Sequence, residues 1–287
     1  MIHIAKYQSD SEAKIKRAIK VFISLNYYLF LKLCRICCRA LGMSVPGTFI
    51  ILIYHSVKER YRDRFAKQMD EVCKIGKVVN ADYSGTLENN YLYIAVTFDD
   101  GYQNIINNAL PEMIKRNIPA TIFMTTGYFG KKADWVVDKK SHNYGETILN
   151  EEQIIRLHEC GVSFGSHTVS HPYLANLNRD ALASEIRESK MTLEKLLSSK
   201  ITLCSLPYGA VDKSESAVFK DAGYKRVFLN VPMWRDNNSK EIYYGRTDIK
   251  PNDWLIEYRL KFRGAYAWQA SVSRIKDAMS DVFGKKK

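Results

Sequence analysis

Short apolar runs alternate with amphipathic helical patterns along most of this chain, from Gly47 onward. Start and stop signals agree with the helical pattern, because Asn150 and Asn178 precede two of these segments, and Gly161 and Gly223 follow two. Strands that alternate with helices are typical of a parallel α/β fold, either a barrel-like sheet or an open doubly wound sheet. The predicted strands are 49–55, 93–98, 119–126, 162–167, 201–206, 225–230 and, least regular, 241–246; the predicted helices are 106–117, 150–160, 179–197 and 212–223.

Residues 1–45 differ from the rest because basic residues flank an uncharged run, VFISLNYYLFL, at 21–31. The run is shorter than the roughly 20 residues that cross a bilayer, and no A-x-A cleavage site follows it. We therefore predict neither a spanning helix nor a conventional signal peptide. Two placements fit: a helix in the membrane interface, held by apolar burial and anionic lipid, or a helix packed against the protein's own body. The flanking basic residues are Lys14, Lys16, Arg17, Lys20, Lys32, Arg35 and Arg39.

Composition narrows the classes of protein to consider. With 287 residues, 46% of them hydrophobic, the chain can bury a sizeable core, which excludes a disordered tail. The net charge of +12 fits an anionic membrane or another polyanion, but the basic residues follow no nucleic-acid recognition motif, so we predict no nucleic-acid partner. Six cysteines lack the density of a disulfide scaffold, and we predict that they are mostly reduced.

Candidate chemistry lies at the ends of two predicted strands. Asp99 and Asp100 follow the strand YIAVTF, at the sheet edge where α/β folds build their sites, although such a pair can also cap the next helix. His167 and His171 follow another strand, and two imidazoles with one carboxylate form a plausible metal set. One carboxylate would hold a divalent cation with an open position for water. The other would accept a proton as that water attacks a carbonyl.

These residues belong to three short motifs that resemble a known family. VTFDDGY (96–102), HTVSH (167–171) and LPYGA (206–210) look like the first three motifs of the polysaccharide deacetylases, carbohydrate esterase family 4, with its NodB-like domain. The resemblance covers about 47–247. It implies a distorted (β/α)7-type barrel, here with an N-terminal helical appendage. It also implies metal-dependent hydrolysis of an N-acetyl, less often O-acetyl, group on a sugar polymer or glycoconjugate.

The resemblance also implies roles, position by position. Asp99 would be the general base, and Asp100, His167 and His171 would hold the divalent metal, often zinc. The backbone N–H of Tyr208 would stabilise the oxyanion. On this basis we divide the chain into a membrane-associating helical segment, 1–45, and a deacetylase-like catalytic domain, 46–287.

Two departures from the family pattern matter. The Arg that steadies the catalytic Asp in the third motif is replaced by Ser205, and Arg246, together with Asp248, is our candidate replacement. The His that acts as general acid in the last motif is missing, because no His follows His171. We propose His55, at the end of the run IILIYH, as the acid or as a residue that orients the substrate; the alternative is that it bonds its own loop. The other histidines are His3, His142 and His158.

Two further features have competing interpretations. Some aromatic residues near the predicted rim could stack on sugar rings, although packing is the commoner role. The stretch 254–269 is predicted to form a helix that covers the barrel, and the alternative is a second membrane-facing surface. The rim aromatics are Tyr102, Tyr128, Trp135, Tyr173, Tyr208 and Trp234.

Together these observations predict a metal-dependent deacetylase acting on an N-acetylated sugar of a bacterial surface polysaccharide, such as an exopolysaccharide, or its lipid-linked precursor. We predict membrane association, with the cytoplasmic face favoured by the reduced cysteines and the missing cleavable signal, and the extracytoplasmic side as the alternative. The rival class is a catalytically inactive carbohydrate-binding or scaffold protein on the same barrel. The missing Arg and late His favour this rival, whereas the intact Asp-Asp and His-x-x-x-His set disfavours it.

Overall fold

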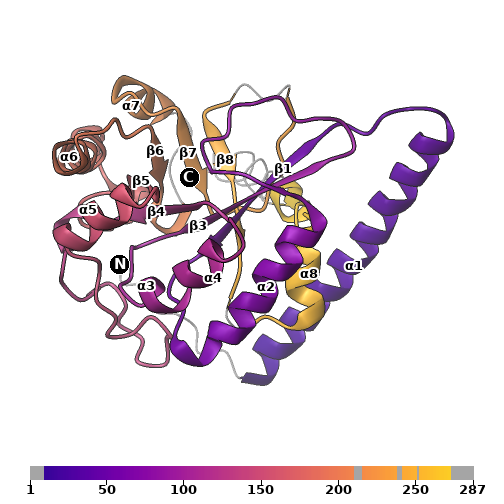
Figure 1. The fold of residues 1–287 in the computed structure, drawn as a ribbon, viewed down its shortest axis with the longest axis horizontal. Coiled ribbons are helices and arrows are strands. Elements are labelled where there is room, and N and C mark those ends of the chain that lie inside the picture. The colour runs from indigo at the N-terminus through magenta and orange to yellow at the C-terminus, as the bar shows by residue number, and fades with distance from the viewer. Residues whose placement is uncertain (1–9, 210–214, 238–240, 251, 273–287) are drawn as a thin grey trace, which may run out of the picture.

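A computed structural model describes residues 10–209, 215–237, 241–250 and 252–272. Its centre is a sheet of nine strands in the order β8-β7-β6-β5-β4-β3-β1-β9, with β2 pairing with β3, and every pairing is parallel (Figure 1). The strands are β1 (Thr48–Tyr54), β2 (Lys77–Val78), β3 (Leu92–Phe98), β4 (Ala120–Met124), β5 (Ser163–Ser166), β6 (Leu203–Ser205), β7 (Arg226–Leu229), β8 (Tyr243–Gly245) and β9 (Thr247–Asp248).

The sheet curls into a nearly closed barrel, and its closure depends on one interrupted strand. β8 pairs with β7 on one side, and β9 pairs with β1 on the other. Only Arg246 separates β8 from β9, and its backbone N–H donates to the carbonyl of Leu229. Counting β8 and β9 as one strand gives seven parallel strands around the ring, so the predicted (β/α)7-type barrel is confirmed.

Alternation of side chains along the strands creates two apolar layers. On β1, Phe49 and Ile51 point into the barrel, where they meet Phe123 and Phe228 from the opposite strands. The intervening residues of β1, such as Leu52, face the helices that cover the outside. The continuous apolar runs in the sequence reflect this burial on both faces of each strand.

The helices outside the barrel agree with the prediction in part. The segments 150–160 and 179–197 are helical, and the side chains of Asn150 and Asn178 cap them as expected. The segment 106–117 forms two short helices instead of one. Part of 212–223 is helical, while 212–214 lie outside the described residues. The helices are α1 (Asp10–Ala40), α2 (Arg62–Ile75), α3 (Ile105–Asn108), α4 (Leu110–Ile114), α5 (Glu151–Glu159), α6 (Arg179–Leu197), α7 (Ser216–Asp221) and α8 (Leu255–Phe262), with 3-10 turns η1 (Glu59–Tyr61), η2 (Thr126–Tyr128), η3 (Leu174–Asn176) and η4 (Pro207–Gly209).

The predicted helix over 254–269 is too long, because α8 ends at Phe262. Gly264, two residues later, has φ of +71°, a left-handed conformation that glycine adopts without strain and that ends the helix. Tyr258 and Phe262 are buried in the main core. The helix therefore covers the barrel, as predicted, and its buried face is not a membrane-facing surface.

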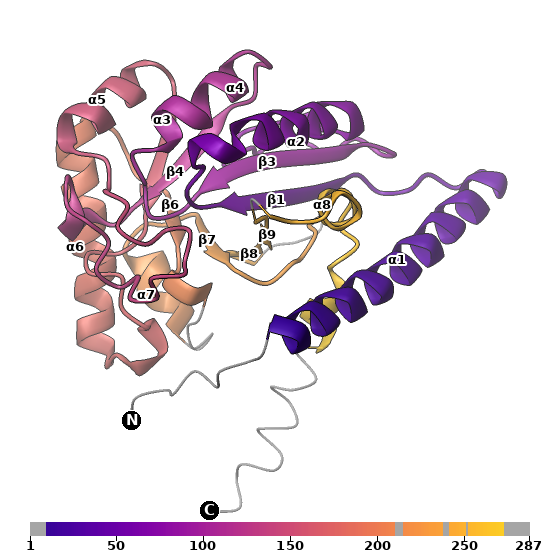
Figure 2. The ribbon, with the colours of Figure 1, turned by 90° about the horizontal axis from the view of Figure 1, so that it is seen from below.

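Helix α1 lies along one flank of the molecule, beside α8 (Figure 2). Val21 packs against Leu260 and Tyr266, and Trp268 Nε1 donates a hydrogen bond to Ser24 Oγ at 2.9 Å. Arg17 forms an ion pair with Glu257 at 2.5 Å. The prediction of a helix packed on the protein's own body is confirmed for this face of α1.

The other face of α1 is apolar and open. Its 31 residues include a segment, Lys14–Ala40, whose length and composition suffice to cross a membrane, and only 11% of its most apolar window is buried. The sequence-based count of eleven residues was wrong because it stopped at Lys32, although single basic residues do not end an apolar helix. By length and composition, α1 therefore qualifies as a membrane anchor or a signal sequence.

Candidate metal and catalytic site

The predicted site residues meet at the carboxyl ends of the barrel strands, around a pocket of about 420 Å³. Each comes from a different place in the ring: the aspartates follow β3, the histidines follow β5, and Arg246 occupies the junction of β8 and β9. Because parallel strands bring their carboxyl ends to one edge, residues far apart in sequence converge there. Among the pocket's lining residues are His55, Asp99, Asp100, Tyr102, Trp135, His167, His171, Tyr208 and Asn230.

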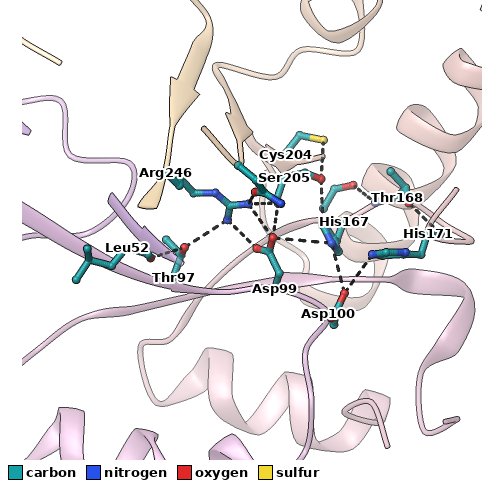
Figure 3. Close-up of polar contacts among 12 residues, drawn as sticks. Leu52, Thr97, Asp99, Asp100, His167, Thr168, His171, Cys204, Ser205 and Arg246 are labelled. Carbon is teal, nitrogen blue, oxygen red and sulfur yellow. Dashed lines mark hydrogen bonds and ion pairs between the residues drawn. The ribbon is translucent and has the colours of Figure 1, made fainter. Parts of the chain in front are cut away.

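The two adjacent aspartates point in different directions (Figure 3). Asp100 has φ of +67° and Gly101 has φ of +77°, so the chain turns sharply directly after Asp99. Glycine adopts this φ without strain, and a Cβ at position 101 would also crowd the side chain of Met124. This turn sends Asp99 toward Arg246 and Asp100 toward the imidazoles.

Asp100, His167 and His171 form a compact, buried set of possible metal ligands, with all ligand atoms within 4.8 Å of one another. Asp100 Oδ1 lies 3.4 Å from Nε2 of each histidine and has no hydrogen-bond partner among the described residues. His167 Nδ1 lies 2.9 Å from the carbonyl oxygen of Ser205, which can only accept, so Nδ1 carries the proton and the Nε2 lone pair is available. This donor set fits a divalent cation.

Electrostatics in this set favour a charged carboxylate. Burial alone would raise the pKa of Asp100, but the imidazoles of His167 and His171 hold it well below its ordinary value. Burial lowers the pKa of His171, whereas for His167 the carboxylates of Asp99 and Asp100 outweigh burial and raise the pKa. A deprotonated carboxylate beside a neutral imidazole is the form in which both groups bind a metal.

Trp135 supports the ligand His171, a role that the sequence did not reveal. The two rings stack with centroids 4.4 Å apart and planes 10° from parallel. Tyr208 meets the same imidazole edge-on at 4.9 Å. Trp135 was predicted only as one of several rim aromatics, and no local pattern in its loop indicates this contact.

The other half of the site is a buried ion pair between Asp99 and Arg246, with exposed fractions of 1% and 0%. Nη1 and Nη2 of Arg246 each donate to a different oxygen of Asp99, both at 2.7 Å. Ser205 Oγ donates to Asp99 Oδ2 at 2.9 Å, and Asn230 Oδ1 accepts from Arg246 Nη2 at 2.8 Å. The guanidinium of Arg246 thus pairs with Asp99, and among the described residues no hydrogen bond or ion pair joins it to Asp248.

This pairing sets the charge of Asp99. Burial would raise the pKa of Asp99, but Arg246 and then His167 lower it below its ordinary value. Sequence reasoning identified Arg246 because it ends a strand at the right edge. It missed Asn230, and it treated Ser205 only as a departure from the family, although its hydroxyl donates a hydrogen bond to Asp99.

His55 and Tyr208 line the same pocket. Tyr208 has φ of +58° and a half-exposed side chain, while His55 directly follows β1. Of the other histidines, His158 on α5 packs against Phe164 of β5, and His3 lies outside the described residues. His142 has its pKa lowered, first by burial and then by the charge of His55.

Comparison with known proteins agrees with this geometry. Residues 88–227 match the model of the polysaccharide deacetylase family. Poly-beta-1,6-N-acetyl-D-glucosamine N-deacetylase from Staphylococcus aureus is 25% identical over 278 residues, 90% of this chain and 88% of that protein. Peptidoglycan-N-acetylmuramic acid deacetylase PdaC from Bacillus subtilis is 27% identical over 195 residues, 67% of this chain and 38% of that protein.

A solved structure shares the fold. IcaB from Ammonifex degensii superposes with a TM-score of 0.63 and 23% identity, covering 78% of this chain and 99% of that one. The chain spans about two fifths of the length of the Bacillus curated relatives that it matches.

Proposed function

Because this chain belongs to the polysaccharide deacetylase family, we propose that it is a metal-dependent hydrolase that removes N-acetyl groups from a sugar of an acetylated glycan. One observation carries the proposal: a buried carboxylate ion-paired to Arg246 lies beside a buried set of cation ligands in one open pocket. The S. aureus relative, matched over 88% of its length, favours an N-acetylated amino sugar over an O-acetyl ester.

The pocket residues divide the work of amide hydrolysis. Asp100, His167 and His171 would hold the cation, and their mix of imidazole and carboxylate suits zinc. Such a cation acidifies water and polarises the acetyl carbonyl. Asp99 accepts the proton of the attacking water, and Arg246 with Ser205 keeps this carboxylate ionised and oriented.

Two further steps involve the carbonyl oxygen of the acetyl group and the amine that leaves with the sugar. The backbone N–H of Tyr208, on the pocket wall, stabilises the negative charge that develops on the carbonyl oxygen. An amine leaves only when it is protonated, and His55 supplies this proton in our proposal. Since Arg246 contacts Asp99, one of the two arguments for an inactive scaffold no longer applies.

The test is acetate release from N-acetylated β-1,6- and β-1,4-linked glucosamine oligomers by metal-loaded protein. We expect release from at least one oligomer, and its loss after chelation and in Asp99→Asn. Stoichiometric metal binding with no release from any N-acetylated glycan, including surface-glycan extracts, would contradict the proposal and favour the scaffold.

His55 has its own test, based on the leaving group. A phenol leaves without protonation, whereas an amine does not, so His55→Ala should slow amide hydrolysis by about 10²-fold and barely change hydrolysis of an aryl acetate. His158→Ala, on α5 outside the pocket, is the matched control. Equal loss on both substrates would remove the acid role and leave a structural one.

We also propose that α1 binds a membrane while it stays packed on α8. Phe22 and Leu33 are both more than half exposed, whereas Val21 of the same helix is buried against α8. Apolar burial and nearby basic residues would hold these exposed side chains in the interface of an anionic leaflet. The other exposed apolar residues of the helix are Ile15, Ile19, Ile23, Leu29, Phe30 and Ile36.

Vesicle flotation tests this placement. F22S/L33S should weaken binding to anionic vesicles, whereas I114S/M191S, which removes equally exposed apolar side chains from α4 and α6, should not. Equal binding by both variants would contradict the proposal. Resistance of the bound protein to carbonate extraction would show that α1 spans the bilayer instead of lying in its interface.

The proposal extends to the cytoplasmic face and to a lipid-linked or surface glycan as substrate. All six cysteines are free, and Cys34, Cys37, Cys73 and Cys160 are exposed, which suits a reducing compartment. In intact cells, a membrane-impermeant maleimide should leave these thiols unlabelled until the cells are lysed. Labelling before lysis would place the domain outside the membrane.

A further inference from the structure

A second cavity adjoins the catalytic pocket. It has a volume of about 590 Å³ and lies between the first turns of α1, strand β9 and helix α8. Asn230 lines both spaces, so it forms a shared wall, and its side-chain oxygen accepts the hydrogen bond from Arg246. The two spaces thus adjoin at Asn230, and a glycan chain whose acetyl group lies at Asp99 would reach the second cavity by passing this residue.

Four charged residues of the cavity neutralise one another. Arg17 pairs with Glu257 at 2.5 Å and with Asp253 at 3.5 Å. Lys261 pairs with Asp253 at 2.6 Å and with Glu257 at 3.5 Å. Two cations and two carboxylates in mutual contact leave no net charge for a ligand.

The other charged residues of the lining are unbalanced. They are Lys16, Lys20 and Lys250 against Asp248, which gives 3 − 1 = +2. None of the three lysines forms an ion pair within the part of the chain that the structure describes. We name Lys16, Lys20 and Lys250 the lysine cluster. Ammonium groups that face a cavity without a partner are suited to an anion, and lysine is a common ligand of phosphate.

We propose that the lysine cluster is a subsite for a phosphoryl group carried by the glycan, so that the substrate class is a phosphorylated, N-acetylated glycan. This inference rests on the proposed deacetylase function. The excess of two positive charges matches the charge of a phosphomonoester or of a diphosphate bridge better than that of a neutral sugar. The same chemistry arises from two sources: a glycan attached to a lipid through phosphate, and a polymer with phosphodiesters in its chain.

The test compares two soluble oligosaccharides that differ only in a terminal phosphate. For the wild type, kcat/KM for deacetylation should be about tenfold higher for the phosphorylated oligosaccharide, mainly through a lower KM. This preference should decline as salt is added, because partly exposed charges are screened. In K16Q/K20Q/K250Q, the ratio of the two kcat/KM values should fall toward one.

K195Q/K200Q/K220Q is the matched control, because it removes three exposed lysines from the α6 and α7 side of the barrel, away from α1 (Figure 1). It should keep the preference for the phosphorylated oligosaccharide. A wild type with equal kcat/KM for both, or a control variant that loses the preference equally, overturns the subsite. Metal-loaded protein that deacetylates neither oligosaccharide contradicts the proposed function instead.

The two sources are then separated with the same pair of variants. One arm uses an acetylated glycan linked by diphosphate to a lipid in vesicles of uncharged phosphatidylcholine, which offer the basic residues of α1 no anionic surface. The other arm uses a soluble phosphodiester-linked polymer. A loss of rate in K16Q/K20Q/K250Q, but not in the control, on either substrate supports the subsite and identifies its source. No difference between the variants on both substrates overturns it.

Discussion

Two halves of the site, each built around one of two adjacent aspartates, differ in how their oxygens are satisfied. Both oxygens of Asp99 accept hydrogen bonds, from Arg246 and from Ser205. Asp100 Oδ1 is buried without a hydrogen-bond partner among the described residues and faces two imidazole nitrogens. The oxygens of Asp99 thus find all their partners within the protein, whereas the unpaired oxygen of Asp100 and the two imidazoles together fit a cation.

Under the proposed function, this difference explains why neither half would suffice alone. A carboxylate whose pKa is lowered by Arg246 is a weak base, because it gives up a proton easily. As the proposed base, Asp99 would need water that has been acidified, and Asp100, His167 and His171 would hold the cation that supplies this acidity.

The largest effect should come from removing the cation half. Chelation or His171→Ala should lower kcat/KM by about 10⁴-fold or more, because hydrolysis loses both the acidified water and the polarised carbonyl. Metal content per chain and acetate release check this together. Activity that survives in metal-free protein would show that the two halves are independent.

The next largest effect should come from Asp99→Asn, which distinguishes the Asp99 half from the Asp100 half of the site. Asp99→Asn should lower kcat by about 10²- to 10⁴-fold while the protein still binds one metal per chain, because the ligands are untouched. His171→Ala is the natural contrast, since it loses the metal as well. If Asp99→Asn also failed to bind metal, Asp99 would have to be counted among the ligands.

Arg246→Gln should act on both stability and pH dependence. It leaves a buried carboxylate without its cation, a change that typically costs about 3–5 kcal/mol of unfolding free energy. In the wild type, folding lowers the pKa of Asp99, so its contribution to stability is present above the ordinary pKa of about 4 and declines as the pH falls. In the variant, burial without the guanidinium raises that pKa, and the contribution is lost as the pH rises.

The effect of Arg246→Gln is measured on the acid limb of the pH profile of kcat/KM, and by thermal unfolding. A general base must be deprotonated, so a raised pKa moves this limb to higher pH in Arg246→Gln. Ser205→Ala keeps the ion pair and should shift the limb much less. An unchanged limb in a folded Arg246→Gln protein would mean that Arg246 serves only to close the barrel.

Much of the catalytic edge could be predicted from the sequence because its residues lie in short motifs directly after buried strands. The carboxyl ends of parallel strands lie at one edge of the sheet. This alone predicts that Asp99, His167 and Arg246 lie close together, before any side-chain contact is known. Their partners could not be predicted in this way. Asn230 and Ser205 contribute through side-chain contacts that depend on how the interrupted strand β8–β9 closes the ring.

The flank of the molecule was harder to predict. The sequence of α1 left two placements open, and the structure shows one face packed on α8 and the other exposed, which a hydropathy pattern alone does not distinguish. Helix α2 was missed because its apolar residues are outnumbered by charged ones, although Phe65, Met69 and Val72 are buried. In both helices, tertiary contacts decide which residues are core.

The smallest effect concerns Trp135, which connects the cation half to the pocket wall. Trp135→Ala removes the ring that stacks on His171 and should weaken metal affinity by about tenfold, as the loss of an outer support typically does. Trp135→Phe keeps an aromatic face and should retain most of the affinity. Titration with a competing chelator measures the metal dissociation constant directly. If both variants bind metal like the wild type but have a raised KM for oligosaccharide, Trp135 contacts the sugar and the cation half is rigid without it.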